Sequence, residues 1–296
     1  MVVVDNGSTD ETCDIVRRSF PEALVLSGHG NIGFGRACNL GAEHATFEHL
    51  LFLNPDAVLV SADPDELRVL FQEPNFGALS AMLVEAGAPA RPTLREHSRH
   101  WLVELIATQV LAILSPLAPR PRYVERAQKS GVYTASGAAL LLATEEFREL
   151  GGFDERFFMY YEDTDLSQRY LRRGDTLRSS DALVATHLGG VSAPTARRLA
   201  LSFLGWVEYT NKWNGRRSAK RAAETARLIF STLIVLLGLS GRFTHSRRLS
   251  AKADQLSEMV SAVALGGTAG DPRETHIHYP AASAITSRRF RSRTDG

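Results

Sequence analysis

The sequence predicts an α/β fold in which helices cover a mixed, mostly parallel sheet. Three short apolar runs near the start are typical of buried strands, and two helical segments separate them: the runs are Val2–Val4, Ala23–Leu26 and Leu50–Leu53. Such alternation is typical of parallel strands joined by right-handed crossovers. The chain has 296 residues, 44% of them hydrophobic and 23% charged, which is globular composition with room for a sizeable core.

Local signals place the helix ends. Ser8 or Thr9 can cap a first helix that ends near Phe20, and Asp63-Pro64 opens a later one, since proline fits the first turn. Gly174 ends a helix over 163–173. Further helices are expected over 36–45, 101–114 and 144–150, and further strands over 76–83, 131–142 and 176–186.

The composition changes along the chain and predicts three parts. Residues 1–195 form the α/β domain, 196–265 a helical, membrane-associating region, and 266–296 a disordered tail with little to bury. Arginine and lysine gather over 197–248 and 288–293, although the net charge of the whole chain is only +1. A late basic region suits lipid headgroups or nucleic acid, and a solvated helix face is the plainer alternative.

Two apolar runs, Leu105–Pro119 and Leu228–Gly241, are each shorter than the roughly 20 residues that span a bilayer. The second run has arginines on both sides, which favours an interfacial or buried helix. No secretory signal is expected, and the two cysteines, Cys13 and Cys38, form no CxxC pair. We therefore expect a reducing cytoplasm and free thiols.

Two acidic residues follow predicted strands. Asp5 comes directly after Val2–Val4, and Asp56 closely follows Leu50–Leu53. Ligands of open parallel sheets bind beyond the carboxyl ends of the strands, so neighbouring strands would bring both acids to one edge. Either acid taken alone can equally be a turn residue or a helix cap.

A third acidic cluster opens the helix predicted over 163–173. Glu162, Asp163 and Asp165 follow Tyr160 and Tyr161, and acids stabilise a helix N-terminus by about 0.3–1 kcal/mol each. That effect explains one or two of the acids. A carboxylate among these aromatic rings would be partly desolvated and its pKa raised, which is how a general base is made.

The segment Gly28–Gly33 fits the G-x-G-x-x-G pattern of dinucleotide-binding proteins, after a strand and before a helix. A dehydrogenase-type, NAD-binding protein is therefore one alternative. That pattern expects an acid about 20 residues further on at a strand end, and Asp56 is only roughly placed for it. The acidic cluster at Glu162 would also have no explanation.

Five motifs in order resemble family 2 glycosyltransferases, specifically the bacterial rhamnosyltransferase-like branch. They cover about residues 2 to 210 and are Val3–Asp10, Asn31–Gly41, Leu53–Asp56, Gly151–Leu166 and His187–Gly190. The resemblance implies a GT-A fold, which is a Rossmann-like nucleotide-sugar-binding domain, and an inverting mechanism. The expected donors are dTDP- or UDP-linked sugars, and the branch that the chain resembles implies rhamnose as the sugar.

The resemblance also implies roles for single residues. Asp163 matches the catalytic base, with Glu162 beside it. Asp5 would bind the base or ribose of the donor, and the other expected donor-binding residues are Asn6, Asn31, Gly33, Asn39 and Asn54. Asp56 stands where the metal-binding Asp-x-Asp motif ends, Asn54 replaces its first aspartate, and His187 would lie near the metal or diphosphate. A structural histidine at a strand end is the alternative for His187.

This assignment implies a cofactor and partners. A Mg²⁺ or Mn²⁺ ion at Asp56 would offset the charge of the departing diphosphate, and the acceptor hydroxyl needs a base. The acceptor would be lipid-linked or a polysaccharide, and no nucleic acid is expected. The expected location is cytoplasmic, peripheral on the inner face of the plasma membrane.

The sequence departs from the family pattern at its start. The family opens with a strand ending in a Thr-Tyr-Asn-like turn and a helix before the strand that carries Asp5, and this chain lacks both. Loss of a central strand exposes backbone edges. Either the true start lies upstream, or the chain is a non-catalytic or impaired remnant of a glycosyltransferase.

Overall fold

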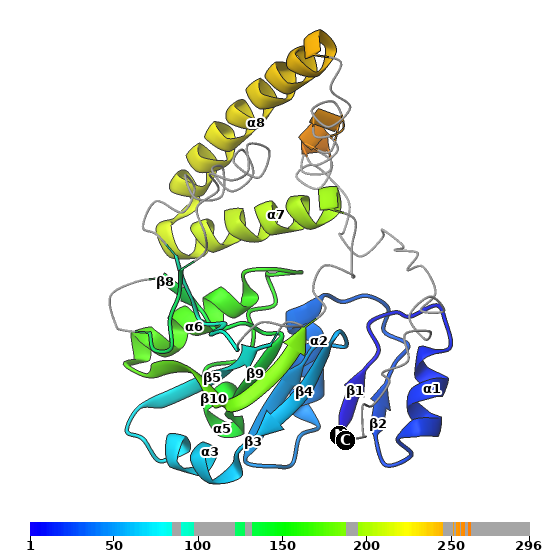
Figure 1. Cartoon of the computed structure of the whole chain (residues 1–296), viewed down its shortest axis with the longest axis vertical. Coiled ribbons are helices and arrows are strands. Elements are labelled where there is room, and N and C mark those ends of the chain that lie inside the picture. The colour runs from blue at the N-terminus through cyan, green and yellow to red at the C-terminus, as the bar shows by residue number, and fades with distance from the viewer. Residues whose placement is uncertain are drawn as a thin grey trace, which may run out of the picture.

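The computed structural model of the chain describes residues 1–84, 90–97, 122–127, 132–187 and 195–244, together with single positions between 251 and 261. Within these residues, two small sheets and one larger sheet are surrounded by helices (Figure 1). The helix predicted over 101–114, the apolar run Leu105–Pro119 and the predicted tail over 266–296 lie outside the described residues.

The larger sheet has five strands in the order β3-β9-β5-β10-β4. Their bounds are β3 His49–Leu53, β4 Ala57–Ala62, β5 Phe76–Leu83, β9 Ala139–Ala143 and β10 Thr176–His187. Strands β5 and β10 pair in parallel, whereas β9 runs antiparallel to both β3 and β5, and β4 runs antiparallel to β10. The mixed sheet is therefore confirmed, with β3, β5 and β10 in one direction and β9 and β4 against them, but among its neighbouring strand pairs only β5 and β10 run parallel, so the expected excess of parallel pairs is not found in this sheet.

The first two strands, β1 (Val2–Val4) and β2 (Leu24–Leu26), form a separate parallel pair. Helix α1 (Thr12–Ser19) connects them and has no buried residue. The expectation that Val2–Val4 and Leu50–Leu53 are neighbours in one sheet is therefore wrong for the described residues, because β3 pairs with β9. Asp5 and Asp56 consequently reach the site from two different sheets.

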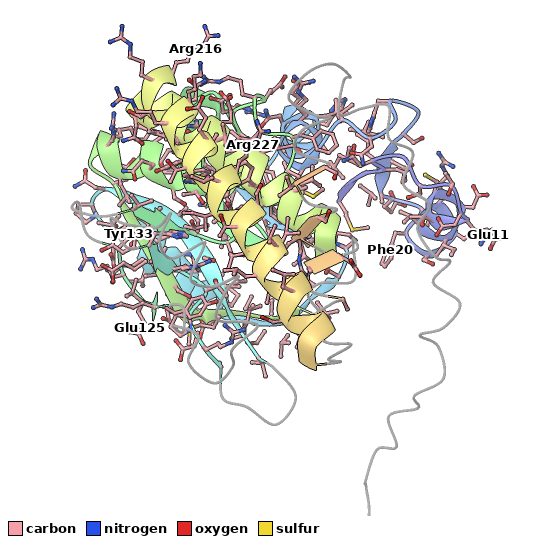
Figure 2. All side chains as sticks on the ribbon, turned by 90° about the horizontal axis from the view of Figure 1, so that it is seen from above. Glu11, Phe20, Glu125, Tyr133, Arg216 and Arg227 are labelled. Carbon is pink, nitrogen blue, oxygen red and sulfur yellow. The ribbon has the colours of Figure 1, made fainter. Side chains whose placement is uncertain are left out.

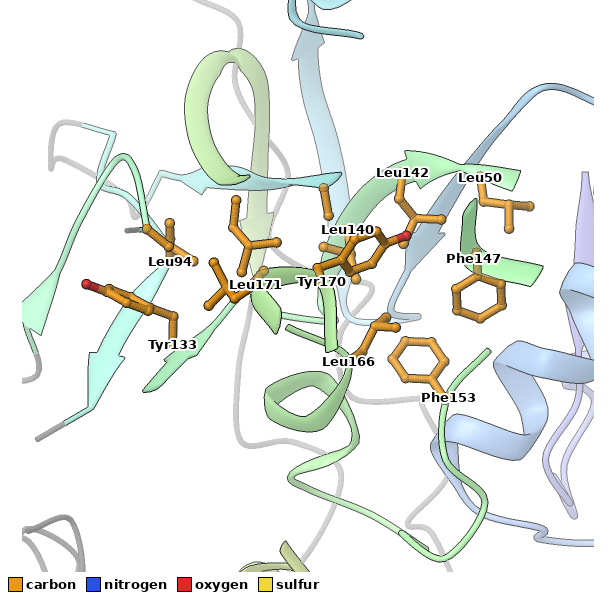
Figure 3. Packing of buried hydrophobic residues seen from close by; sticks show 14 of the residues in the cluster. Leu50, Leu94, Tyr133, Leu140, Leu142, Phe147, Phe153, Leu166, Tyr170 and Leu171 are labelled. Atoms are coloured by element: carbon orange, nitrogen blue, oxygen red, sulfur yellow. The ribbon is translucent and has the colours of Figure 1, made fainter. Parts of the chain in front are cut away.

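Successive side chains of a strand point to opposite faces of the sheet, so both faces of the larger sheet carry apolar residues, and helices cover both. Helices α2 (Phe34–Glu43), α5 (Thr144–Glu149) and α6 (Glu162–Arg173) pack with Leu140 and Leu142 in one core, part of which Figure 3 shows. Leu141, between them in sequence, faces the opposite core, to which α3 (Pro64–Phe71) contributes Leu70.

The remaining strands form a three-stranded antiparallel sheet of β6 (Arg95–His97), β7 (Arg122–Tyr123) and β8 (Val132–Thr134), in the order β7-β6-β8. The strand predicted over 131–142 is therefore two strands, β8 and β9, in different sheets. The chain between them, which contains Gly137, lies beside the N-terminus of α6. This break places a backbone N–H next to Asp163.

Two long helices follow the sheets. Helix α7 (Thr195–Asn214) lies across the end of the larger sheet, next to α6, and α8 (Arg216–Thr244) leads away from it (Figure 1). Phe203 and Trp206 of α7 pack with Ala226 and Phe230 of α8. Gly215, with φ +84°, makes the break between the helices.

Helix α8 is longer than the apolar run Leu228–Gly241. The 25 residues from Arg216 to Ser240 are long and apolar enough to cross a membrane by length and composition alone, and 11% of the apolar window is buried. Core helices of soluble proteins meet the same criterion. Seen from above, α8 crosses the molecule with Arg216 and Arg227 in its first half (Figure 2).

Most local signals for helix ends are confirmed. The Asp63 side chain caps α3 by accepting hydrogen bonds from the backbone N–H groups of Asp65 and Glu66, both at 3.0 Å. Gly174 ends α6 with φ +105°. The predicted cap of α1 by Ser8 or Thr9 is wrong, because α1 begins at Thr12 and its N-cap, Glu11, makes no side-chain capping bond.

Candidate active site

The turn after β1 is joined to the glycine-rich loop by one side chain. Asn6 donates from Nδ2 to the Gly33 carbonyl at 3.1 Å, and its Oδ1 accepts from the Ile32 N–H at 2.9 Å. Asp5 is buried, with its N–H bonded to the Leu26 carbonyl and its Oδ1 accepting from the Ser8 N–H. The predicted donor-binding residues Asp5, Asn6 and Gly33 thus lie together at one edge.

The glycine-rich loop in turn contacts the segment before α6. Gly33 has φ +90°, and a Cβ there would lie 2.3 Å from the Phe158 carbonyl oxygen, so only glycine fits. The Phe34 N–H donates to that same oxygen at 3.0 Å. Asn31 accepts from the Gly33 N–H at 3.1 Å and so shapes this loop. These contacts connect Asp5 to the chain that leads to Asp163.

Asn39, another predicted donor-binding residue, makes a reciprocal pair of bonds with the backbone of Phe153. Its Nδ2 donates to the Phe153 carbonyl at 2.9 Å, and its Oδ1 accepts from the Phe153 N–H at 2.8 Å. Phe153 is buried against the rings of Phe34, Phe52 and Phe147. Asn39 therefore fixes the Gly-Gly-Phe-Asp segment to α2, and a contact with the donor stays a prediction.

The loop that carries Asn54 and Asp56 leads from β3 into β4. The Asn54 N–H donates to the Ala138 carbonyl at 2.9 Å, one residue beyond Gly137. The backbone of His187 at the end of β10 pairs with Ala57, next to Asp56. The sheet therefore places Asn54, Asp56 and the backbone of His187 at the same end as the 136–138 segment.

A divalent cation fits part of this arrangement. The Asn54 Oδ1 is buried and has no hydrogen-bond partner within the described part of the chain, and the Asp56 carboxylate is two residues away. Carboxylate and amide oxygens suit Mg²⁺ and Mn²⁺. Among the described residues, no three His, Cys, Asp or Glu side chains gather in a group that could hold a metal. The side chain of His187 lies outside the described part.

Asp163 lies at the N-terminus of α6 with its carboxylate towards the 136–138 segment. Its Oδ2 accepts from the Gly137 N–H at 3.4 Å, and its Oδ1 accepts from the Thr164 N–H at 2.8 Å. Asp163 as a whole residue is half-buried. Burial raises the pKa of Asp163 above its ordinary value, although the two N–H donors oppose the shift. A carboxylate with a raised pKa at a partly open position is suited to accept a proton.

Glu162, the residue before Asp163, is 5% exposed and lies against α2. Its Cβ lies 3.6 Å from where a side chain on Gly35 of α2 would begin, and its Oε2 has no hydrogen-bond partner within the described residues. Burial, followed by the charge of Asp163, raises the pKa of Glu162 well above its ordinary value. An acceptor hydroxyl reaches a partly exposed carboxylate more readily than a buried one, so the exposure favours Asp163 between the two.

The turn before α6 is strained. Tyr160 and Tyr161 have φ of +70° and +73°, a region that bulky residues rarely adopt. Each such residue costs about 1–3 kcal/mol and persists only where its surroundings hold it. The strain falls on the two residues directly before Glu162 and Asp163.

The third acid of the cluster, Asp165, is held in a buried network of hydrogen bonds and ion pairs. It is fully buried and accepts bonds from Arg169 Nε at 2.9 Å, Trp213 Nε1 at 3.0 Å and Lys212 Nζ at 2.6 Å. The same Lys212 Nζ bonds Asp154 Oδ2 at 2.7 Å. Partial burial opposes ionisation of Asp154, but bonds from Arg156 and Lys212 hold its pKa well below the ordinary range. Lys212 was not predicted, because no local pattern links residues 47 apart in sequence.

Hydrogen bonds and close backbone contacts therefore join the segments that carry Asp5, Gly33, Asp163 and Asn54 at one end of the fold. The edge offers a buried acid and backbone amides on one side and a carboxylate with raised pKa on the other. Such an edge can bind a polar nucleotide and remove a proton from a hydroxyl.

Comparisons with known proteins agree with this chemistry. The model of the glycosyl transferase family 2 matches residues 1–84. The chain is 29% identical over 253 residues to N-acetylglucosaminyl-diphospho-decaprenol L-rhamnosyltransferase of Mycobacterium tuberculosis, covering 74% of this chain and 80% of the relative. It is 22% identical over 241 residues to low-salt glycan biosynthesis hexosyltransferase Agl10 of Haloferax volcanii, covering 80% of this chain and 73% of the relative.

Among solved structures, the mannosyltransferase PcManGT from Pyrobaculum calidifontis in complex with GDP-Man and Mn²⁺ matches with a TM-score of 0.50 and 17% identity. The match covers 89% of this chain and 76% of that one and concerns the fold. The chain is a glycosyltransferase with the GT-A fold. The match of residues 1–84 to the family 2 model and the similarity to a rhamnosyltransferase set the dehydrogenase alternative aside.

Proposed function

We propose that this glycosyltransferase moves a sugar, rhamnose in the first instance, from a nucleoside diphosphate to a hydroxyl of a lipid-linked acceptor. The observation that carries the proposal is the position of Asp163, half-buried at the Gly137 N–H beside the loop of Asn54 and Asp56. The curated relatives support the class of donor and acceptor: one is named for rhamnosyl transfer to N-acetylglucosaminyl-diphospho-decaprenol. Synthesis of a cell-wall or surface polysaccharide would follow.

The reaction is a single displacement with inversion at the anomeric carbon. Asp163 takes the proton of the acceptor hydroxyl while the new bond from its oxygen to the anomeric carbon forms and the bond to the diphosphate breaks. Asp5, Asn6, Asn31, Gly33 and Asn39 belong to the segments that would face the donor nucleotide. Asn54, Asp56 and His187 would hold Mg²⁺ or Mn²⁺, which when bound supplies positive charge against the diphosphate.

The test is a transfer assay with dTDP-rhamnose, UDP-N-acetylglucosamine or GDP-mannose as donor and polyprenyl-diphospho-N-acetylglucosamine as acceptor, with Mg²⁺ or Mn²⁺. We expect transfer from dTDP-rhamnose, loss of transfer with a chelator, and a drop of about 10²–10⁴-fold in Asp163→Asn. Asp65→Asn is the matched control, because Asp65 is exposed and, within the described residues, forms a side-chain ion pair only with Arg68 on α3. A folded, metal-supplied enzyme that transfers from none of the donors contradicts the proposal.

We also infer a peripheral position on the cytoplasmic face of the membrane, through α8. Its first half carries an exposed basic group consisting of Arg216, Arg217, Lys220, Arg221 and Arg227. After Arg227 the helix exposes Leu228, Val235, Leu236 and Leu239. Positions 228, 235 and 239 share one side of a helix, so the helix presents cations followed by an apolar stripe. That order suits anionic headgroups beside acyl chains.

Vesicle binding tests this position. We expect the protein to sediment with vesicles that contain phosphatidylglycerol, to bind less in high salt, and to lose binding in Val235→Asp. Val69→Asp is the matched control, because Val69 on α3 is 62% exposed and Val235 on α8 is 59% exposed. Equal binding by the two variants would place the membrane contact elsewhere.

A further inference from the structure

One face of α7 packs directly on the strained turn before α6. A Cβ at Gly205 would lie 2.4 Å from the Tyr160 carbonyl oxygen and 3.0 Å from the Tyr161 ring. Gly205 is in the middle of a helix, where glycine is otherwise unfavourable. Its absence of a side chain is what lets α7 approach the backbone of Tyr160 so closely.

The same face continues the contact towards α6. Tyr209, one turn after Gly205, is buried with its ring centroid 5.9 Å from that of Tyr161, and its hydroxyl donates to Gln168 Oε1 at 3.5 Å. Lys212, three residues further on, bridges Asp154 and Asp165 at 2.7 and 2.6 Å. Residues at i, i+4 and i+7 lie on one side of a helix, so the three act from one surface.

This face of α7 contacts the turn itself and the residues on both sides of it. Asp154 precedes the turn and Asp165 follows it, so the ion pairs of Lys212 connect the two segments that flank the turn. Between these segments, Gly205 packs against the backbone of Tyr160. Arg156 and Arg169 also pair with these two carboxylates, but each pairs with only one of them. Lys212 is therefore the cation, among these three, that links the flanks.

The bonds that the Asp163 carboxylate accepts are either long or come from the next residue in the chain. The bond from the Gly137 N–H to Asp163 is 3.4 Å long, and the shorter one comes from the neighbouring residue, Thr164. If Tyr160 and Tyr161 relaxed to negative φ, the first turn of α6 would rotate and carry Asp163 away from Gly137.

We propose that Gly205, Tyr209 and Lys212 of α7 are positioning residues that hold the Tyr160–Tyr161 turn and thereby aim the Asp163 carboxylate. The proposal rests on the proposed role of Asp163 as base. It gives the C-terminal helices a part in transfer itself, beyond any contact with a membrane.

The first experiment compares Gly205→Ala with Gly238→Ala in the full chain. Both replace a helical glycine, but a Cβ at Gly238 has no atom within 4 Å. We expect Gly205→Ala to lower kcat about 10- to 100-fold with KM for the donor within about twofold, because a small misplacement of the base affects the chemical step. Gly238→Ala should match the wild type, and equal kcat values for the two variants overturn the proposal.

Lys212 provides a second variant if Gly205→Ala folds poorly. Lys212→Met should lower kcat while leaving KM for the donor in place, and Lys212→Arg should restore part of the loss because it keeps a cation between Asp154 and Asp165. A kcat for Lys212→Met equal to that of wild type contradicts a positioning role for the ion pairs of Lys212.

Amide hydrogen exchange separates this proposal from the proposed function. Exchange at Tyr160–Thr164 should accelerate at least about tenfold in Gly205→Ala and not in Gly238→Ala, whether or not the right substrates are known. An inactive wild type refutes the proposed function only, and unchanged exchange in Gly205→Ala refutes the positioning role.

Discussion

The two sides of the candidate site are held by different kinds of contact. On the base side, α6 packs in the main core through Leu166 and Tyr170, and Lys212 ties its acids to α7. On the donor side, the described part of α1 buries no residue, β1 and β2 pair only with each other, and Asn6 provides the side-chain bonds to the glycine-rich loop. The base side is thus fixed by core packing and ion pairs, whereas the nucleotide-facing part is fixed by the packing of β1 against Gly41 of α2 and by a few polar contacts.

The two sides of the site should differ in the free energy at which they open. Regions with few buried apolar contacts open at lower free energy than the core. We therefore expect the β1–α1–β2 unit to open first and to be the part that a bound nucleotide stabilises most.

The largest effect should come from the contact that joins the two sides, at Gly33. A Cβ in Gly33→Ala would meet the Phe158 carbonyl at 2.3 Å, whereas Gly28, with nearly the same φ of +91°, has no atom within 4 Å. We expect Gly33→Ala to lose about 1–3 kcal/mol more unfolding free energy than Gly28→Ala. Urea unfolding measures both, and equal losses would show that conformation alone, without the contact, sets the cost.

The sequence predicts those parts of the fold that local chemistry decides. Asp63-Pro64 and Gly174 mark helix ends through bonds and backbone angles within a few residues, and both predictions are confirmed. Strand β4 was not predicted, because Ala57–Ala62 directly follows the Asn54-Pro55-Asp56 turn without a separate signal. The sheet to which β1 belongs was predicted wrongly, because strand partners depend on distant residues.

In the candidate site, too, the sequence predicts what local residues decide and misses what distant residues decide. The motifs predict the segments that carry Asp5, Asp56 and Asp163, since their residue types are specific to the chemistry. Which carboxylate of Glu162 and Asp163 is buried depends on Gly35 of α2, and the partner of Asp165 lies on α7. Neither fact has a local signature in the sequence.

A smaller effect is expected at Asn6. Asn6→Ala removes both bonds to the glycine-rich loop and should lower the local free energy of opening of β1 and α1 by about 1–3 kcal/mol. Hydrogen exchange should accelerate at Val2–Val4 and leave α6 unchanged. Asn31→Ala is the control, since Asn31 bonds only within its own loop. Faster exchange throughout α6 in Asn6→Ala would show that the two sides open together.

The smallest effect concerns Glu162 and depends on pH. Its folded-state pKa lies above the ordinary value of 4.5, so ionisation of the unfolded chain lowers stability as pH rises above 4.5. Glu162→Gln removes this loss and should stabilise the protein at pH 8 by an amount on the order of 1 kcal/mol, with no gain below pH 4.5. Thermal unfolding across pH measures it, and a gain that is independent of pH contradicts a pKa of Glu162 that burial raises.

The central claim is that Asp163, and not its neighbour Glu162, removes the acceptor proton. The most direct measurement compares kcat for glycosyl transfer in the two isosteric variants, Asp163→Asn and Glu162→Gln, at saturating donor. The account predicts a loss of about 10²–10⁴-fold for Asp163→Asn and a kcat within about tenfold of wild type for Glu162→Gln. The reverse order, or equal losses in both variants, would contradict it.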